Sequence, residues 1–186
     1  PATIENFSIT GNGDGVDIYA SGTVKLKGLS ITNLETTGFY ISGDGVATRV
    51  EVEEVYISGI TPSAVYGMGF GVYVVNADFV MKKGVIEDVE IYGINAHDTD
   101  LEFEDVSIKD VLAPGTPLPS WVKTAAFAVN DSDVSVDRLL IRDVFNRGYG
   151  QLGEGSATLS NLVVTGVAEE GVYLEDAELE ISQAYI

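Results

Sequence analysis

The sequence predicts an all-β protein built as a solenoid of about seven to eight coils, each made of three short strands. Three observations lead to this fold class. A short motif, reading apolar, any, polar, apolar, any, then Ile or Val, recurs along the whole chain. A Gly, Asn or Asp follows most copies at a fixed distance, and another alternating apolar segment comes after it. No helical period competes with this pattern over a comparable length.

The motif occurs in eight copies. They are IENFSI 4–9, LKGLSI 26–31, VEEVYI 52–57, IEDVEI 86–91, FEDVSI 103–108, VDRLLI 136–141, LSNLVV 159–164 and ISQAYI 181–186. Alternation indicates strands, because successive side chains of a strand point to opposite faces. The two-residue gap inside the motif indicates a bend that keeps both halves facing one interior. The last motif positions, among them Ile57, Ile91 and Ile108, are therefore expected to form an interior ladder.

The second residue after each motif is expected to form a tight corner. These residues are Gly11, Asn33, Gly59, Gly93, Asp110, Asp143 and Gly166, all of types that tolerate a left-handed backbone. The third strand of each coil is expected next, in the segments GVDI 15–18, GFYI 38–41, GVYVV 71–75, AAFAV 125–129 and GVYL 171–174.

This repeat resembles the right-handed parallel β-helix family, the fold of pectate lyases, many tailspikes and numerous bacterial surface proteins. The resemblance covers essentially the whole chain. It implies one domain over residues 1–186, a right-handed single-stranded parallel β-helix that we expect to be a fragment of a longer chain. It says little about activity, because the family includes lyases, hydrolases, epimerases, adhesins and inert spacers.

Composition limits the partners. Ten Lys and Arg oppose 29 Asp and Glu, and the formal net charge of −19 argues against nucleic acid as a ligand. No apolar run is long enough to predict a membrane span. Cys is absent, which fits a prokaryotic extracellular or cell-surface protein. Both ends of the chain match the repeat without a readable cap, which indicates either a fragment of a longer protein or capping by neighbouring chains through end-to-end or lateral self-association.

One acidic column is a candidate metal site. Aligning the copies at their third position places Glu54, Asp88 and Asp105 in consecutive coils. Oxygen ligands of this kind suit Ca²⁺, although no cofactor is required by the sequence. The alternative is that these side chains splay into solvent, with Arg138 tempering their charge. Further acidic residues at the later corners, including Asp78, Asp98 or Asp100, Asp131 or Asp133, and Glu154, are explained by turn chemistry.

Three insertions form the second candidate site. They are 61–71, 112–125 and 145–151, and the repeat places them on the same side of the solenoid. Aromatic side chains there could stack on sugar rings, with basic groups available to bind hydroxyls. The predicted binding residues are Tyr66, Met68, Phe70, Trp121, Lys123, Arg147 and Tyr149. The alternative is that these loops fold over the edge of the solenoid, with Trp121 as a plug.

Two classes of function remain open. The first is a non-catalytic extracellular module, structural or adhesive, that binds glycan or another protein chain on the insertion side. The second is a polysaccharide-active lyase or hydrolase that uses carboxylates and Ca²⁺. The only histidine, His97, lies in an expected turn, and the signatures of lyase and glycosidase sites are missing. The sequence therefore favours the non-catalytic class.

Overall fold

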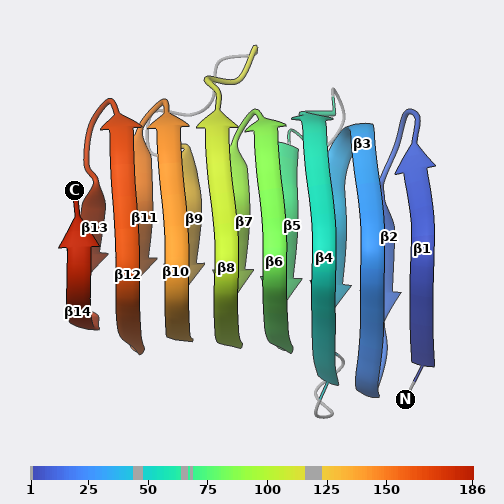
Figure 1. Ribbon diagram of the computed structural model, residues 1–186, viewed down its shortest axis with the longest axis horizontal. Coiled ribbons are helices and arrows are strands. Elements are labelled where there is room, and N and C mark those ends of the chain that lie inside the picture. Colours follow the sequence, from blue (N-terminus) through green and yellow to red (C-terminus); the bar gives the residue numbers. More distant parts are fainter. Residues whose placement is uncertain (1, 44–47, 64–66, 68, 116–122) are drawn as a thin grey trace.

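The computed structural model describes residues 2–43, 48–63, 67, 69–115 and 123–186, and within these ranges it contains strands but no helix (Figure 1). The strands are β1 (Ala2–Thr10), β2 (Val16–Tyr19), β3 (Gly22–Ser42), β4 (Thr48–Thr61), β5 (Gly69–Val75), β6 (Asp78–Val89), β7 (Tyr92–His97), β8 (Asp100–Val111), β9 (Ala125–Asn130), β10 (Asp133–Val144), β11 (Arg147–Leu152), β12 (Ser156–Val167), β13 (Val172–Glu175) and β14 (Glu178–Tyr185). No described segment is a helix that could cross a membrane.

The strands form two layers, and the strands within each layer are parallel to one another. Sheet A contains the long strands β1, β4, β6, β8, β10, β12 and β14 together with the first part of β3. Sheet B contains the shorter strands β2, β5, β7, β9, β11 and β13 together with the last part of β3. Because β3 takes part in both layers, the two sheets are joined by hydrogen bonds into one continuous sheet.

The chain follows a right-handed path. In Figure 1 it rises along each strand of sheet A, crosses behind, descends along a strand of sheet B and then moves one coil further along the axis. This confirms the predicted parallel β-helix. The first two strands expected in each coil are one continuous strand here, because the ladder pairs residues on both sides of the bend between them, as from Asp133 to Val144 in β10.

Each bend rests on a residue with a left-handed backbone. One such residue interrupts the middle of each sheet A strand, at Asn6, Gly28, Glu54, Lys83, Asp105, Arg138, Asn161 and Gln183. A second column lies near the strand end, at Asn33, Gly59, Asp88, Asp110, Asp143 and Gly166. This second column is the predicted corner, except that Asp88 stands where the sequence pattern placed Gly93. Only Gly and a few polar types adopt this conformation cheaply, so Glu54, Lys83 and Arg138 carry backbone strain.

The fourth motif copy was predicted wrongly. Ile57 and Ile108 both pair with Ile86, so the copy runs from Met81 to Ile86 and not from 86 to 91. The true copy escaped notice because Gly84 stands where the other copies have an apolar residue with a side chain. Met81 compensates: its Sδ lies 2.5 Å from where a Cβ on Gly84 would be, so the longer side chain fills the vacant space.

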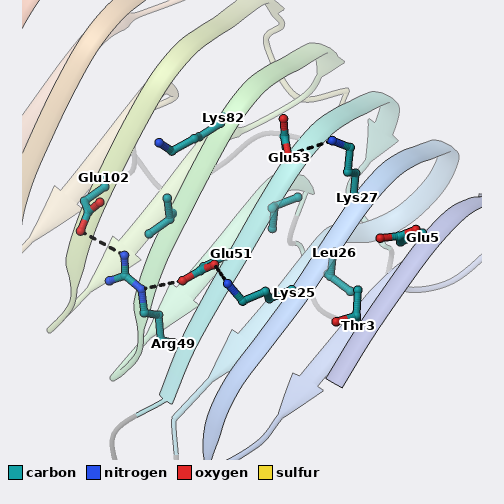
Figure 2. Close-up of a pocket in the computed structure, with 12 residues that line it drawn as sticks. Thr3, Glu5, Lys25, Leu26, Lys27, Arg49, Glu51, Glu53, Lys82 and Glu102 are labelled. Carbon is teal, nitrogen blue, oxygen red and sulfur yellow. Dashed lines mark hydrogen bonds and ion pairs between the residues drawn. The ribbon is translucent and has the colours of Figure 1, made fainter. Parts of the chain in front are cut away.

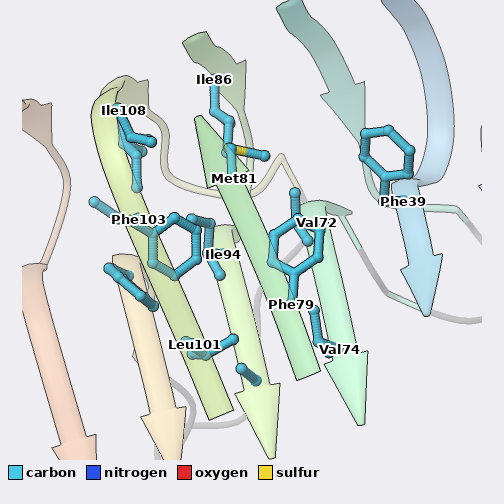
Figure 3. Packing of buried hydrophobic residues seen from close by; sticks show 14 of the residues in the cluster. Phe39, Val72, Val74, Phe79, Met81, Ile86, Ile94, Leu101, Phe103 and Ile108 are labelled. Carbon is cyan, nitrogen blue, oxygen red and sulfur yellow. The ribbon is translucent and has the colours of Figure 1, made fainter. Parts of the chain in front are cut away.

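The core lies between the two sheets. Ile31, Ile57, Ile86, Ile108 and Ile141 are fully buried and form the predicted interior ladder, with Ile86 in place of Ile91. Aromatic rings also lie in the interior, and Figure 3 shows Phe79 and Phe103 facing the residues of sheet B. Edge-to-face contacts link Phe79, Phe103, Phe127 and Tyr149, at centroid distances of 5.9, 4.9 and 5.4 Å. Such ring pairs stabilise the fold beyond the area that they bury.

Candidate functional site

The predicted metal column is not formed. The residue between Glu54 and Asp105 in the bend column is Lys83, and Asp88 belongs to the second bend column instead. The Lys83 Nζ lies 2.9 Å from Glu53 Oε1 and 3.4 Å from Glu54 Oε1. The cause of the error is the shifted fourth copy. Across the described residues, no group of three or more acidic or histidine side chains is arranged to hold a metal ion.

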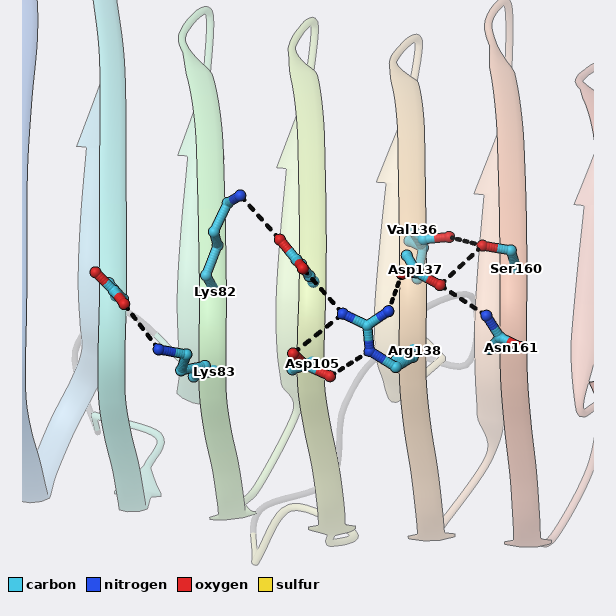
Figure 4. Close-up of polar contacts among 10 residues, drawn as sticks. Lys82, Lys83, Asp105, Val136, Asp137, Arg138, Ser160 and Asn161 are labelled. Atoms are coloured by element: carbon cyan, nitrogen blue, oxygen red, sulfur yellow. Dashed lines mark hydrogen bonds and ion pairs between the residues drawn. The ribbon is translucent and has the colours of Figure 1, made fainter.

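A network of ion pairs takes the place of that column. Figure 4 shows Arg138 reaching from β10 to Asp105 on β8 and to Asp137 on its own strand. Its Nε is 2.5 Å from Asp105 Oδ1, and its Nη2 is 2.9 Å from Glu104 Oε1. The hydrogen bond from Arg138 holds the pKa of Asp105 below its usual value. These carboxylates are therefore occupied by cations of the chain itself.

A hollow on the outer face of sheet A is also lined by ion pairs. It has a volume of about 400 Å³, and its lining residues come from β1, β3, β4, β6 and β8 (Figure 2). Within it Lys25 contacts Glu51 at 2.6 Å, and Arg49 bridges Glu51 at 3.1 Å and Glu102 at 3.2 Å. Each cation has a carboxylate partner, so the hollow offers a ligand little net charge.

The acidic corner lies where sheet B strands return to sheet A. Asp98 and Asp131 adopt left-handed backbones there, as turn chemistry predicts. Asp78, Asp100 and Asp133 begin three consecutive strands beside a hollow of about 590 Å³. Burial, with the charges of Asp78 and Asp133, raises the pKa of Asp100. Hydrogen bonds from the Ser156 hydroxyl and backbone N–H lower the pKa of Asp133. Neighbouring carboxylates thus have opposite effects on stability.

Substitutions at this corner are expected to change stability in opposite directions. Asp100→Asn should stabilise the protein by a few tenths of a kcal/mol at neutral pH, because it removes a carboxylate whose ionisation the fold disfavours. Asp133→Asn should destabilise it by a similar amount, because Ser156 hydrogen-bonds the ionised form. The Asp100 effect should vanish as the pH falls below the ordinary Asp pKa of about 3.9, and the Asp133 effect should vanish only at a lower pH, because the pKa of its carboxyl is lowered in the folded chain. Urea denaturation at neutral and acid pH measures the change in unfolding free energy for each variant. If both substitutions stabilised the protein at neutral pH, or both destabilised it, the opposite roles of Asp100 and Asp133 would be contradicted.

The aromatic groove predicted on the insertion side is not formed by the residues that are described. Tyr66, Met68 and Trp121 lie outside the described residues. Phe70 is only 8% exposed, and Tyr149 is fully buried.

Tyr149 is buried because residues 147–152 are strand β11 and not an insertion. Its hydroxyl donates a hydrogen bond to Gln151 Oε1 at 2.7 Å, and burial raises its pKa. The Gln151 Nε2 in turn donates to the Ser132 carbonyl at 3.0 Å, so this pair is satisfied inside the core.

Aromatic side chains gather instead on the outer face of sheet B. Tyr40 and Tyr73 pair in register between buried neighbours and therefore point outward. Their ring centroids are 5.4 Å apart, and Tyr19 extends the row at 5.5 Å from Tyr40. Phe70 lies 5.6 Å from Tyr73 and 5.2 Å from Tyr92. We call these five residues the aromatic ladder. The sequence signal was the shared Tyr in GFYI and GVYVV.

The aromatic ladder ends at a gap in the same face. The outward residues that follow Tyr92 and Asn95 along the axis are Ala125, Ala128 and Gly150, which carry little or no side chain. The resulting hollow has a volume of about 90 Å³, and its lining residues are Tyr92, Lys123, Ala125, Ala128, Arg147, Gly150 and Leu152. We call it the sheet B notch. Tyr92 and Arg147 lie two coils apart on its two sides, with Ala125 between them.

Two predicted binding residues, Lys123 and Arg147, do meet at the sheet B notch. The Lys123 Nζ lies 2.8 Å from Glu169 Oε2, and the Arg147 Nε lies 2.9 Å from Glu170 Oε2. The guanidinium carbon of Arg147 is 3.6 Å from the centre of the Tyr173 ring, a cation–π contact that fixes its plane. Arg147 is therefore held rigidly at one side of the notch.

His97 lies outside the lining of the sheet B notch. His97 was expected in a solvated turn, but it ends β7 half-buried, with its ring 5.9 Å from Tyr73. Burial lowers the pKa of His97, which favours the neutral imidazole. Arg147 and Lys123 both face carboxylate partners. The notch itself is bounded by the ring of Tyr92, by small residues and by the two paired cations.

The comparisons with known proteins give one match. The sequence signature of a family described as right-handed β-helix region fits residues 2–121. No curated protein and no solved structure matches significantly.

Proposed function

The chain belongs to the right-handed β-helix family, and we propose that it is a non-catalytic module of a prokaryotic extracellular or cell-surface protein, which binds carbohydrate at the sheet B notch. The observation that carries this proposal is the notch itself. It interrupts an aromatic face with a floor of Ala and Gly, between the ring of Tyr92 and the fixed guanidinium of Arg147.

The physical fit is to one ring of a sugar chain. A pyranose has an apolar face that packs on an aromatic ring and hydroxyl groups that bind charged or amide side chains at its edge. The floor residues Ala125 and Gly150 are buried in paired strands, so the notch is preformed and little ordering entropy opposes binding.

We propose a non-catalytic role because the basic side chains at the notch are already held in ion pairs. General acid–base chemistry needs groups free to gain or lose a proton near the substrate. At the notch, Lys123 and Arg147 are engaged by Glu169 and Glu170. The absence of Cys and the acidic surface support the extracellular location.

Filling the notch is expected to abolish carbohydrate binding. In Ala128→Phe, the new ring should occupy the hollow and continue the aromatic ladder, so the protein should stay folded while its affinity for any glycan found on an array falls by about tenfold or more. The matched control is Thr158→Phe, which adds the same ring to an exposed, outward position on sheet A.

The outcome of this comparison decides the proposal. Binding by the parent and by Thr158→Phe, but not by Ala128→Phe, supports it. Equal binding by all three proteins would place the ligand elsewhere. A parent protein that binds no glycan on a broad array would refute carbohydrate binding altogether. Circular dichroism and thermal melting of each variant confirm that the comparison is made on folded protein.

A further inference from the structure

We propose that Lys123 and Asn146 form an isopeptide bond, an intramolecular amide between the lysine Nζ and the asparagine Cγ, with Glu169 as the proton acceptor. Three observations carry this inference: the hydrogen bonds that hold the Asn146 amide, the contact between Lys123 and Glu169, and the order of these residues along the solenoid. The inference does not depend on the carbohydrate binding proposed above.

The side-chain amide of Asn146 is the electrophile. Asn146 is 9% exposed and lies in the corner between β10 and β11. Its Oδ1 accepts two hydrogen bonds, from the Thr124 backbone N–H at 3.2 Å and from the Thr124 hydroxyl at 2.7 Å. Two donors on one carbonyl oxygen make its carbon more electrophilic, and they stabilise the negative charge that the oxygen gains when an amine attacks.

The Lys123 amine is the nucleophile, and the stacking of the coils brings it to Asn146. The Arg147 N–H donates to the Thr124 carbonyl at 3.1 Å, so the corner of Asn146 stacks on the segment that begins with Lys123. The Glu169 N–H donates to the Asn146 carbonyl at 3.0 Å, so Glu169 lies one coil further on. The Lys123 Nζ nevertheless lies 2.8 Å from Glu169 Oε2 and 3.2 Å from Oε1. The lysine side chain therefore spans the coil that carries Asn146.

Glu169 is placed to move the protons of this reaction. Hydrogen bonds from Lys123 and, to a smaller extent, from the Asn146 side chain lower the pKa of Glu169. Its carboxylate is therefore ionised at neutral pH and can accept a proton from the amine, which is the role of a general base. The same carboxylate interacts with the nucleophile and with the amide that it attacks.

The reaction balances without an oxidant or a cofactor. The Lys123 ammonium gives a proton to Glu169, and the neutral Nζ forms a bond to the Asn146 Cγ. Glu169 passes this proton to Nδ2 as the Cγ–Nδ2 bond breaks, and it takes a second proton from Nζ as the new amide forms. Nδ2 leaves as ammonia and carries that second proton away as ammonium. The reaction occurs once in each molecule and turns over no substrate, so the chain remains a non-catalytic module.

Intact mass spectrometry of the full chain tests the cross-link. After several days at about pH 8, where more of the amine is neutral, the parent is expected to weigh about 17 Da less than its sequence requires, the mass of one ammonia. Peptide mapping should give a branched peptide that joins the segment of Lys123 to the segment of Asn146. A parent protein that keeps its full mass throughout would overturn the proposal.

Three variants separate this cross-link from other losses of ammonia. Lys123→Arg keeps a cation beside Glu169, but a guanidinium stays protonated and does not attack, so this protein should keep its full mass. Glu169→Gln keeps the shape of the side chain but accepts no proton, so the loss should slow by about tenfold or more. The control Lys82→Arg changes another lysine whose Nζ lies 2.8 Å from a carboxylate, and it should lose ammonia at the parental rate.

The outcomes of these variants distinguish the roles. A loss of ammonia that persists in Lys123→Arg comes from a different asparagine and refutes the cross-link. An unchanged rate in Glu169→Gln refutes the role of Glu169 as the proton acceptor.

The cross-link should also raise the melting temperature. It ties consecutive coils together and restricts the unfolded chain, as a disulfide does. The cross-linked parent is therefore expected to melt about 5–10 °C above Lys123→Arg. Equal melting of cross-linked and unlinked protein would contradict a bond between coils.

Discussion

Replacing Ile108 by Asp is expected to destabilise the protein by about 4–5 kcal/mol or more. Ile108 is fully buried and pairs with Ile86 on one side and Ile141 on the other. The substitution loses the roughly 1.5–3 kcal/mol that burial of Ile contributes, and it places a carboxyl group where the interior supplies no partner. Because a domain of this size has a total stability of about 5–15 kcal/mol, much of it would be lost.

The position of Ile108 increases the effect. Each coil of a solenoid contacts only its neighbours, so a defect in the middle of the chain separates the coils before it from those after it. Thermal melting should show a lower midpoint and a loss of cooperativity. The matched control is Ser107→Asp, on the outward-facing neighbour, which should melt within a few degrees of the parent. An Ile108→Asp protein that melts like this control would refute the interior ladder.

The sequence predicted the fold because the β-helix repeats one local pattern. Alternation, the bend and the left-handed corner are all short-range features, and each was visible in most copies. The fourth copy failed because its packing depends on two residues together. Gly84 leaves space that Met81 fills, and such compensation cannot be seen when each column is considered separately. The neighbouring segment 86–91 satisfied every column and was chosen in its place.

The same limit explains the error at residues 145–151. A segment with Arg, Gly, Tyr and Gln has the composition of a loop. Only the contacts between Tyr149, Gln151 and the Ser132 carbonyl allow its polar groups to be buried in a strand. A hydrogen-bonded network of this kind joins residues from different coils, so it cannot be predicted from the residues of one short segment.

Only part of the predicted binding set lies together in the structure. Aromatic rings beside Lys123 and Arg147 were expected, and those two residues do line the sheet B notch. The aromatic component came from outward positions of sheet B, where Tyr40, Tyr73 and Tyr92 lie on successive strands. The notch itself depends on Ala128 and Gly150, and small residues give no positive signal in a sequence.

Replacing Gly93 by Val is expected to destabilise the protein by about 3 kcal/mol, because no space exists for a side chain there. A Cβ at Gly93 would lie 2.5 Å from the Ala126 carbonyl oxygen and 2.5 Å from Ile108 Cγ2. Its backbone is not left-handed, so the effect is purely steric. The matched control is Ala126→Gly in the next coil of the same column, which removes a methyl group and should cost only about 0.5–1 kcal/mol. Chemical denaturation measures both variants.

The steric argument follows from how the two sheets meet. Glycines form one column along sheet B, and a Cβ at Gly38, Gly71 or Gly93 would contact the next carbonyl along the axis at 2.5–2.6 Å. It would also contact the methyl group of an interior-ladder residue, which is Ile57, Ile86 and Ile108 in turn. The β-branched ladder of sheet A can pack this closely only because sheet B presents bare backbone to it. A Gly93→Val protein as stable as Ala126→Gly would therefore contradict the close packing of the two sheets, and with it the rigidity on which the notch depends.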